Sequence, residues 1–242
     1  MKFSTKITNL QRQINYNSMK LVVLTGAGIS AESGIKTFRD SDGLWENYSI
    51  DDVCTAEALQ KNPELVFDFY NQRRKDAMKA EPNFAHKGLV ELEQRYDVQI
   101  ITQNVDDLHE RAGSKHILHL HGELTKCRSM IYTDKIYDMP ERALTYGEKG
   151  PDGTLLRPHI VFFNEAVPNI EPAIEIVKEA DILVIIGTSM VVYPAAGLLM
   201  YAKRGIPIYV IDPKIPTLSK GYNITAIKKA ATEGVKELLT LL

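Results

Sequence analysis

Cysteine is scarce in this sequence, and positive and negative charges nearly balance. Only Cys54 and Cys127 occur among the 242 residues, which excludes a disulfide framework and a metal site built from four cysteines. The formal net charge is −2, so no basic field favours nucleic acid or an anionic membrane. We expect a protein of a reducing compartment that binds neither nucleic acid nor a membrane.

Long apolar runs are also missing. No stretch of about 18 apolar residues is present to span a bilayer, and residues 1–15 lack the apolar core of a secretory signal. We therefore expect a cytoplasmic protein. The length fits one large domain or one domain with an insertion, and the sequence carries no signal for an oligomeric state.

Short β-branched runs alternate with helix-like segments along most of the chain. This alternation is typical of an α/β fold with a Rossmann-like parallel sheet and helices on both of its faces. Strands are predicted at Leu21–Leu24, Val98–Thr102, Ile182–Ile186 and Ile208–Ile211, and helices at 63–79, 86–96, 194–204 and 226–241. Asn62 as N-cap and Pro63 at the first helical position mark the clearest helix start. Residues 1–19 are predicted to form a helix or a loose arm.

Two stretches, about 36–85 and 125–156, interrupt the regular alternation. The first holds the polar loop D-S-D-G-L-W-E-N-Y and a helix, and the second is polar and rich in turns. We interpret both as a small lobe inserted into a large lobe that consists of about 1–35, 86–124 and 157–242. A cleft is expected between the two lobes.

A glycine-rich turn, G-A-G-I-S-A-E-S-G-I-K-T-F-R, follows the first predicted strand. The spacing of Gly26, Gly28 and Ala31 meets the dinucleotide fingerprint, in which glycines let backbone N–H groups approach a pyrophosphate. A dehydrogenase would continue from there through a full helix into a second buried strand. Here Ser33 and Gly34 end the helix early and no buried strand follows, so a dehydrogenase is the least favoured function.

Further polar residues follow other predicted strands. T-Q-N-V-D-D-L-H begins at the end of one strand and G-T-S follows another, so both belong to the carboxyl edge of the sheet, where open α/β sheets bind ligands. H-L-H-G-E places His119 and His121 on one side of a strand-like segment. These motifs predict one ligand site at this edge.

Six motifs, taken in order, resemble those of the sirtuins, the family of NAD-dependent protein-lysine deacylases. They are G-A-G-I-S-A-E-S-G-I-K-T-F-R, T-Q-N-V-D-D-L-H, H-L-H-G-E, L-R-P-H-I-V-F-F-N-E, G-T-S and Y-P-A-A-G, and the resemblance covers about 20–240. It implies a single catalytic domain that consumes NAD. In the family the acyl-lysine carbonyl oxygen attacks the nicotinamide ribose carbon, nicotinamide leaves, and the acyl group ends on ADP-ribose.

The resemblance also implies roles for individual residues. His121 matches the general base that activates a ribose hydroxyl, and an imidazole with a reference pKa of about 6.5 suits that task. Asn104 would hold the ribose and a water, and Asp106 the nicotinamide carboxamide. The acyl-lysine protein would pair as an extended strand beside Val161 and Phe163. The implied cofactor contacts are Gly26, Ala27, Gly28, Phe38, Arg39, Gln103, Asn104, Asp106, Gly187, Thr188, Ser189 and Asp212.

The acyl pocket is predicted from F-D-F-Y-N-Q-R-R. Tyr70 and Arg73 are three residues apart on a predicted helix and project from one face. A tyrosine hydroxyl beside a guanidinium is a receptor for a carboxylate, and the pair resembles that of the desuccinylase and demalonylase sirtuins. Succinyl-, malonyl- or glutaryl-lysine is therefore a candidate substrate alongside acetyl-lysine.

The sequence departs from the family pattern in several places. Sirtuins usually hold a structural zinc with two C-x₂-C pairs, whereas the region 125–156 keeps only Cys127, and one thiolate cannot make that tetrahedral site. We therefore predict no zinc. Lys36 stands where proline is common, and Asp212 replaces an asparagine near the adenine ribose. Asn164 stands where glycine is usual, and asparagine tolerates a positive φ better than most residues.

Other functions on the same fold stay open. An ADP-ribosyltransferase or an NAD hydrolase would use the activated ribose without releasing an acyl group, and a sensor would bind NAD without turnover.

We interpret His109, His116 and His119 as structural or surface residues. Asp106 is predicted to be a helix N-cap as well as a cofactor contact.

Overall fold

The structure is a computed structural model that describes residues 19–37, 44–45, 48–217 and 221–242. The helix or arm predicted over 1–19 lies outside the described residues except for Met19. The predicted cofactor contacts Phe38 and Arg39 also lie outside them. Among the helices of the described part, none has the length and apolar character that crossing a bilayer needs.

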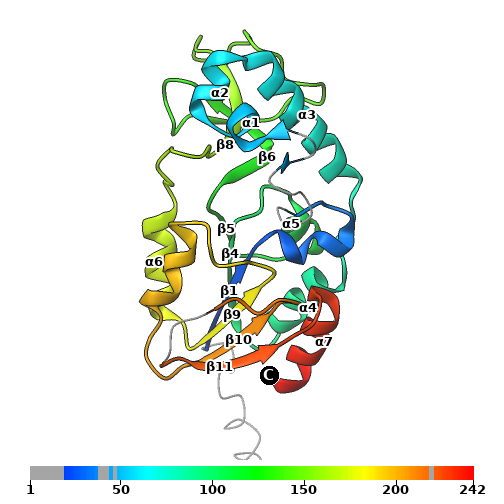
Figure 1. Ribbon diagram of the computed structural model, residues 1–242, viewed down its shortest axis with the longest axis vertical. Coiled ribbons are helices and arrows are strands. Elements are labelled where there is room, and N and C mark those ends of the chain that lie inside the picture. The colour runs from blue at the N-terminus through cyan, green and yellow to red at the C-terminus, as the bar shows by residue number, and fades with distance from the viewer. Residues whose placement is uncertain (1–18, 38–43, 46–47, 218–220) are drawn as a thin grey trace, which may run out of the picture.

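A six-stranded parallel sheet forms the larger part of the fold (Figure 1). Its strands are β1 (Lys20–Thr25), β4 (Asp97–Thr102), β5 (Ile117–His119), β9 (Ile182–Ile186), β10 (Pro207–Ile211) and β11 (Asn223–Ile227). They lie in the order β11-β10-β9-β1-β4-β5, which is the Rossmann order 6-5-4-1-2-3 when these six strands are numbered along the chain. β1 therefore lies between β4 and β9, and the sheet continues beyond these two strands in opposite directions.

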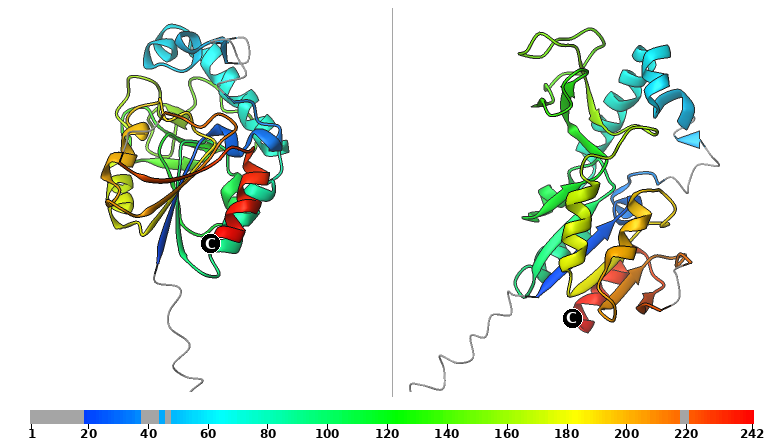
Figure 2. Two further views of the ribbon diagram at one scale, coloured as in Figure 1. Left: turned by 60° about the horizontal axis from the view of Figure 1, so that its bottom comes forward. Right: turned by 90° about the vertical axis from the view of Figure 1, so that its left-hand side faces the viewer.

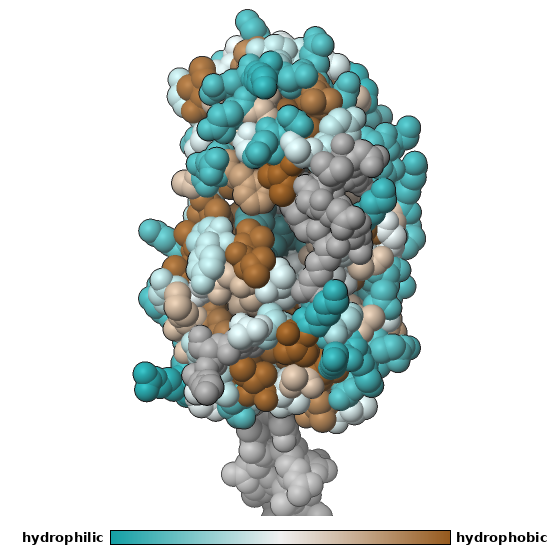
Figure 3. All heavy atoms as spheres, in the orientation of Figure 1, coloured by the Kyte–Doolittle hydropathy of each residue, from teal (hydrophilic) through white to brown (hydrophobic). Residues whose placement is uncertain are grey.

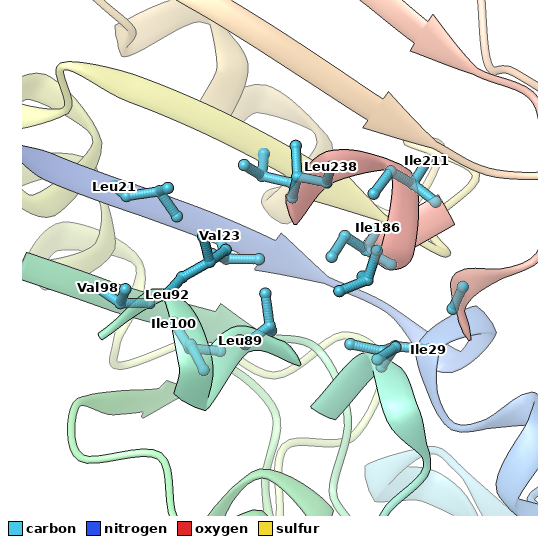
Figure 4. Packing of buried hydrophobic residues seen from close by; sticks show 14 of the residues in the cluster. Leu21, Val23, Ile29, Leu89, Leu92, Val98, Ile100, Ile186, Ile211 and Leu238 are labelled. Atoms are coloured by element: carbon cyan, nitrogen blue, oxygen red, sulfur yellow. The ribbon is translucent and has the colours of Figure 1, made fainter. Parts of the chain in front are cut away.

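Helices cover both faces of this sheet. They are α4 (Phe84–Leu92) and α7 (Ala231–Leu241) on one face, and α6 (Ile170–Glu179) and the 3₁₀ helix η5 (Ala195–Tyr201) on the other. Leu21 and Val23 pack with the first pair, whereas Val22 and Leu24 pack with the second, because successive strand side chains point to opposite faces. Figure 4 shows Val23 and its neighbours packed against the helices of the first face. The predicted Rossmann-like α/β fold is confirmed.

The second part of the fold, here called the antiparallel module, lies at one end of the molecule (Figure 1). It comprises the antiparallel strands β6 (Gly122–Ser129), β7 (Ile136–Asp138) and β8 (Leu156–Ile160) and the helices α1 (Ile50–Val53), α2 (Ala56–Lys61) and α3 (Pro63–Lys79). The right-hand view of Figure 2 shows this module set apart from the parallel sheet. The predicted lobe boundaries at 124/125 and 156/157 stay a prediction, and they fall inside β6 and β8.

The segment after the glycine-rich turn contributes no strand to the parallel sheet in the part that the structure describes. β2 (Leu44–Trp45) and β3 (Tyr48–Ser49) pair only with each other, and the next strand of the parallel sheet is β4. This arrangement agrees with the argument against a dehydrogenase.

Helix α3 begins as predicted, because the Asn62 side chain accepts a hydrogen bond from the Leu65 amide and Pro63 is its first residue.

One predicted helix is wrong at its start. The segment 226–241 begins inside β11, which continues to Ile227, and α7 begins only at Ala231. β11 pairs in parallel with β10 over its whole length, and such tertiary pairing overrides a local helical pattern. The predicted helix over 194–204 is the 3₁₀ helix η5.

The packing of α7 generates a stability prediction. Leu238 is completely buried against the sheet, whereas Leu241 on the same helix is 50% exposed. Leu238→Ala is expected to lower the free energy of unfolding by about 2–5 kcal/mol, because it removes buried methyl groups and leaves a cavity. Leu241→Ala should change it by about 0.5 kcal/mol or less. Urea unfolding of both variants checks this, and equal losses would contradict the described packing.

Candidate functional site

A cleft opens at the carboxyl ends of the central strands. β1 and β9 are neighbours at the topological switch point of this strand order, where ligands of such sheets bind. The cleft has a volume of about 1130 Å³ and is lined by both parts of the fold, and Figure 3 shows the surface hollowed between them. Every predicted site residue that the structure describes lines it, namely Gly26, Ala27, Gly28, Tyr70, Arg73, Gln103, Asn104, Asp106, His121, Val161, Phe163, Gly187, Thr188, Ser189 and Asp212.

Backbone contact between the glycine-rich turn and the end of β9 closes the floor of the cleft. The Gly28 amide donates to the Gly187 carbonyl at 2.9 Å, and a Cβ on Gly28 would lie 2.5 Å from the Gly187 Cα. No side chain fits there. The turn continues as two short 3₁₀ helices, η2 (Ala27–Ile29) and η3 (Ala31–Ser33), and ends at Gly34 with φ 89°. The helix therefore ends early, as predicted.

Ser30, which the sequence analysis did not single out, connects two predicted site residues below this turn. Its buried hydroxyl donates to Asp106 Oδ2 and accepts from Asn104 Nδ2, both at 3.1 Å. Burial raises the pKa of Asp106, although hydrogen bonds from the Leu108 amide and from Ser30 oppose this. The sequence could have pointed to Ser30 as a site residue only through its place in the glycine-rich motif.

Asp106 also holds the start of helix α5 (Leu108–Ala112), but it is not the N-cap. Its Oδ1 accepts from the Leu108 amide at 3.2 Å, whereas Asp107 occupies the N-cap position. The predicted N-cap is therefore wrong by one residue. The reason is that the polar loop after β4 runs one residue further before the backbone becomes helical.

The half-buried His121 has a defined tautomer in its neutral form. Its Nδ1 lies 3.1 Å from the Gln103 carbonyl oxygen, and since a carbonyl only accepts, Nδ1 carries the proton and Nε2 the lone pair. Burial lowers the pKa of His121, and the hydrogen bond to Gln103 opposes this only in part. The ring is thus set up to accept a proton at Nε2 near neutral pH.

Two further histidines, His119 and His109, contact polar groups within the fold. His119 Nδ1 contacts the Asn104 carbonyl at 3.0 Å, and its Nε2 contacts Glu110 at 2.8 Å. Burial alone would lower the pKa of His119, but the Glu110 carboxylate outweighs it and the pKa is raised. His109 is buried against the Thr25 hydroxyl at 3.1 Å, and His116 is exposed. These contacts agree with structural or surface roles.

Tyr70 and Arg73 lie together in the wall of the cleft. Their exposed fractions are 3% and 9%, and both project from α3. The Arg73 guanidinium lies 5.7 Å from the Phe69 ring centroid, and the Tyr70 ring lies 5.6 Å from that of Phe162. Burial raises the pKa of Tyr70 well above 10, so its hydroxyl keeps its proton. Cys54, another lining residue, was missed because only the tertiary fold brings it here.

The segment after β8 forms one rim of the cleft. Its Val161 amide donates to the His121 carbonyl at 2.9 Å, and its Phe163 amide to the Cys54 carbonyl at 2.8 Å. Asn164 has φ 69°, as expected for a residue at a position where glycine is usual. The opposite rim exposes Val191 by 68% and Tyr193 by 74%.

A partly buried ion pair fixes this rim segment. The Arg157 guanidinium lies 3.9 Å above the Phe162 ring and donates to Glu165 Oε1 at 2.7 Å. The second carboxylate oxygen of Glu165 accepts from the Phe162 amide at 2.8 Å. Each charge therefore meets an opposite charge and further hydrogen bonds, which is what burial of an ion pair requires.

The region predicted to lack zinc folds around Cys127. This thiol is buried among Phe67, Leu144 and Leu156, whereas Cys54 belongs to a separate apolar cluster. Within the described ranges, Glu110, His119 and Glu123 are the only group of three or more residues placed so that they could hold a metal ion. The absence of a structural zinc stays a prediction.

The Sir2 family model matches residues 26–194 of this chain. A Bacteroides thetaiotaomicron protein named NAD-dependent protein deacylase is 55% identical over 227 residues, which covers 92% of this chain and 97% of the relative. An Aggregatibacter actinomycetemcomitans protein of the same name is 58% identical over 203 residues, with 84% and 95% covered.

A solved structure of a Sir2 homologue with NAD superposes with a TM-score of 0.82 at 38% identity. The superposition covers 98% of this chain and 94% of that structure. Similarity over nearly the whole chain, together with a cleft lined by all the described motif residues, confirms the resemblance drawn from the motifs. The chain belongs to the Sir2 family.

Proposed function

We propose that this protein is an NAD-dependent protein-lysine deacylase that favours acidic acyl groups such as succinyl, malonyl and glutaryl. One observation supports the preference most directly. Tyr70 and Arg73, both buried, line the same cleft as His121 and the glycine-rich turn. A cationic group beside a hydroxyl donor is suited to a carboxylate at the end of an acyl chain.

The residues of the cleft fit NAD as the second substrate. When bound, NAD would supply the nicotinamide leaving group and the ribose carbon that receives the acyl oxygen. The close approach of Gly28 to Gly187 leaves backbone without side chains at the floor, so that a pyrophosphate could approach the backbone closely there. Thr188 lies beside Gln103, whose amide donates to its hydroxyl at 3.0 Å. The buried Asp212 at the end of β10 would accept from the adenine ribose hydroxyls.

Three residues would carry the proton transfer and the positioning around the reacting ribose. His121 would take a proton at Nε2, because Nδ1 is held by the Gln103 carbonyl. Asn104 and Asp106 are held by one hydroxyl, that of Ser30, so their side chains keep a fixed relative position. Such positioning lowers the entropy cost of the reaction.

The acyl-lysine segment of a protein substrate would bind between the two rims. The backbone of Val161 and Phe163 on one side and the segment 190–194 on the other would flank an extended peptide. The ion pair between Arg157 and Glu165 keeps the first rim in place. A plain NAD hydrolase has no use for a buried guanidinium and hydroxyl at this position, which is why we favour deacylation.

The pocket proposal predicts a selective loss. A hydrogen bond to a charged group contributes about 1.5–3 kcal/mol. Arg73→Met should therefore lower kcat/KM for a succinyl-lysine peptide by about tenfold to hundredfold and affect an acetyl-lysine peptide far less. The matched control is Arg74→Met, since Arg74 is not among the lining residues and donates to the Arg142 carbonyl at 3.2 Å. Equal losses for both peptides in Arg73→Met would contradict the proposal.

The state of His121 predicts the pH dependence. A base must be neutral, and a pKa lowered below 6.5 keeps the imidazole neutral down to a lower pH. Activity should thus be complete at neutral pH, and kcat/KM should fall with a midpoint below pH 6.5 as His121 gains a proton. Steady-state kinetics across this range in a constant-ionic-strength buffer checks it, and a midpoint above neutral pH would contradict the role.

A further inference from the structure

The H-L-H segment 119–121 holds the loop after β4 by three consecutive carbonyls, those of residues 102–104. The Leu120 amide donates to the first of these carbonyls at 2.9 Å. His121 Nδ1 lies 3.1 Å from the second carbonyl oxygen, and His119 Nδ1 lies 3.0 Å from the third. The two imidazoles of this segment therefore hold the backbone of two neighbouring residues that line the cleft.

His119 differs from His121 in that both of its ring nitrogens face an acceptor. Its Nδ1 donates to the Asn104 carbonyl, since a carbonyl has no proton to give. Its Nε2 lies 2.8 Å from Glu110 Oε1 in an ion pair. Burial alone would raise the pKa of Glu110, but the hydrogen bond and the charge of His119 outweigh it and the pKa is lowered. The ring consequently carries a proton on each nitrogen, and a flipped ring would lose both contacts.

Asn104 is held by its backbone as well as by its side chain. The side-chain amide donates to the Ser30 hydroxyl at 3.1 Å, and the backbone amide donates to the Thr102 hydroxyl at 3.0 Å. The backbone carbonyl is the group that His119 holds. Asn104 is buried, so loss of the His119 donor would remove a partner from this carbonyl at a cost that favours a shift of the loop. Such a shift would move the Asn104 side chain with it.

We propose that His119 is a positioning residue for the NAD chemistry, whose Nδ1–H holds the backbone of Asn104 and thereby keeps the Asn104 side chain in place at the reacting ribose. Glu110, which is not among the residues lining the cleft, orients the ring from the other side. This inference rests on the proposed function, in which Asn104 holds the ribose. Because His119 acts on the reacting ribose and not on the acyl pocket, its loss should lower kcat without changing the KM for the peptide or the preference for succinyl over acetyl.

Two variants separate the two contacts of the ring in steady-state kinetics with NAD and a succinyl-lysine peptide. His119→Asn keeps a donor at the δ position, facing the Asn104 carbonyl, whereas His119→Gln places its amide at the ε position, facing Glu110. The kcat of His119→Asn should stay within about threefold of the wild-type value. That of His119→Gln should fall by about tenfold to hundredfold, because the reacting groups lose their alignment. The control is His116→Gln, since His116 is exposed and kcat should not change.

The outcomes separate this inference from the proposed function. Both variants remove the charge of His119, and the Glu110 side chain is 40% exposed and stays hydrated without it, so each variant should fold. Equal kcat values in the two variants, or a lower value in His119→Asn, would overturn only the role of His119. A loss in His119→Gln that comes with a lower urea midpoint than that of His119→Asn would also overturn it, because that pattern marks a residue needed for the fold. Wild-type protein that removes no acyl group would overturn the proposed function and this inference with it.

Discussion

The contact between Gly28 and Gly187 is the constraint on which the site depends. It joins the turn after β1 to the end of β9 at a distance that no Cβ permits, and it exists only because the strand order makes these two strands neighbours. Two residues after Gly28, the same turn places the Ser30 hydroxyl between Asn104 and Asp106. The position of the glycine-rich turn therefore fixes the side chains of the polar residues that follow β4, through the hydrogen bonds of Ser30.

Burial shifts the pKa values of three polar residues of the cleft. It lowers the pKa of His121, raises that of Asp106 and raises that of Tyr70. A neutral imidazole, a carboxyl held by two donors and a protonated phenol therefore lie around one cleft at neutral pH. These states agree with the proposed proton acceptor and the proposed carboxylate receptor.

Much of the fold could be predicted from the sequence, because its signals are local. The runs that became β1, β4, β9 and β10 are short and β-branched, and α3 begins at Asn62 and Pro63 with a side-chain cap. The sequence did not predict β11, because this strand depends on pairing with β10 at the edge of the sheet. In the site, motifs identified the lining residues, whereas Ser30 and Cys54 matter through contacts with residues far away in the chain. The spacing of residues along the sequence does not reveal such long-range contacts.

The most direct measurement is the release of nicotinamide from NAD by the purified protein with acetyl-, succinyl-, malonyl- and glutaryl-lysine peptides and without peptide. Mass spectrometry would follow the peptides and the ADP-ribose products. Our account predicts that release requires an acyl peptide, that acidic acyl groups are removed, and that each nicotinamide is matched by one acylated ADP-ribose. Equal release of nicotinamide without any peptide would contradict it and identify an NAD hydrolase instead.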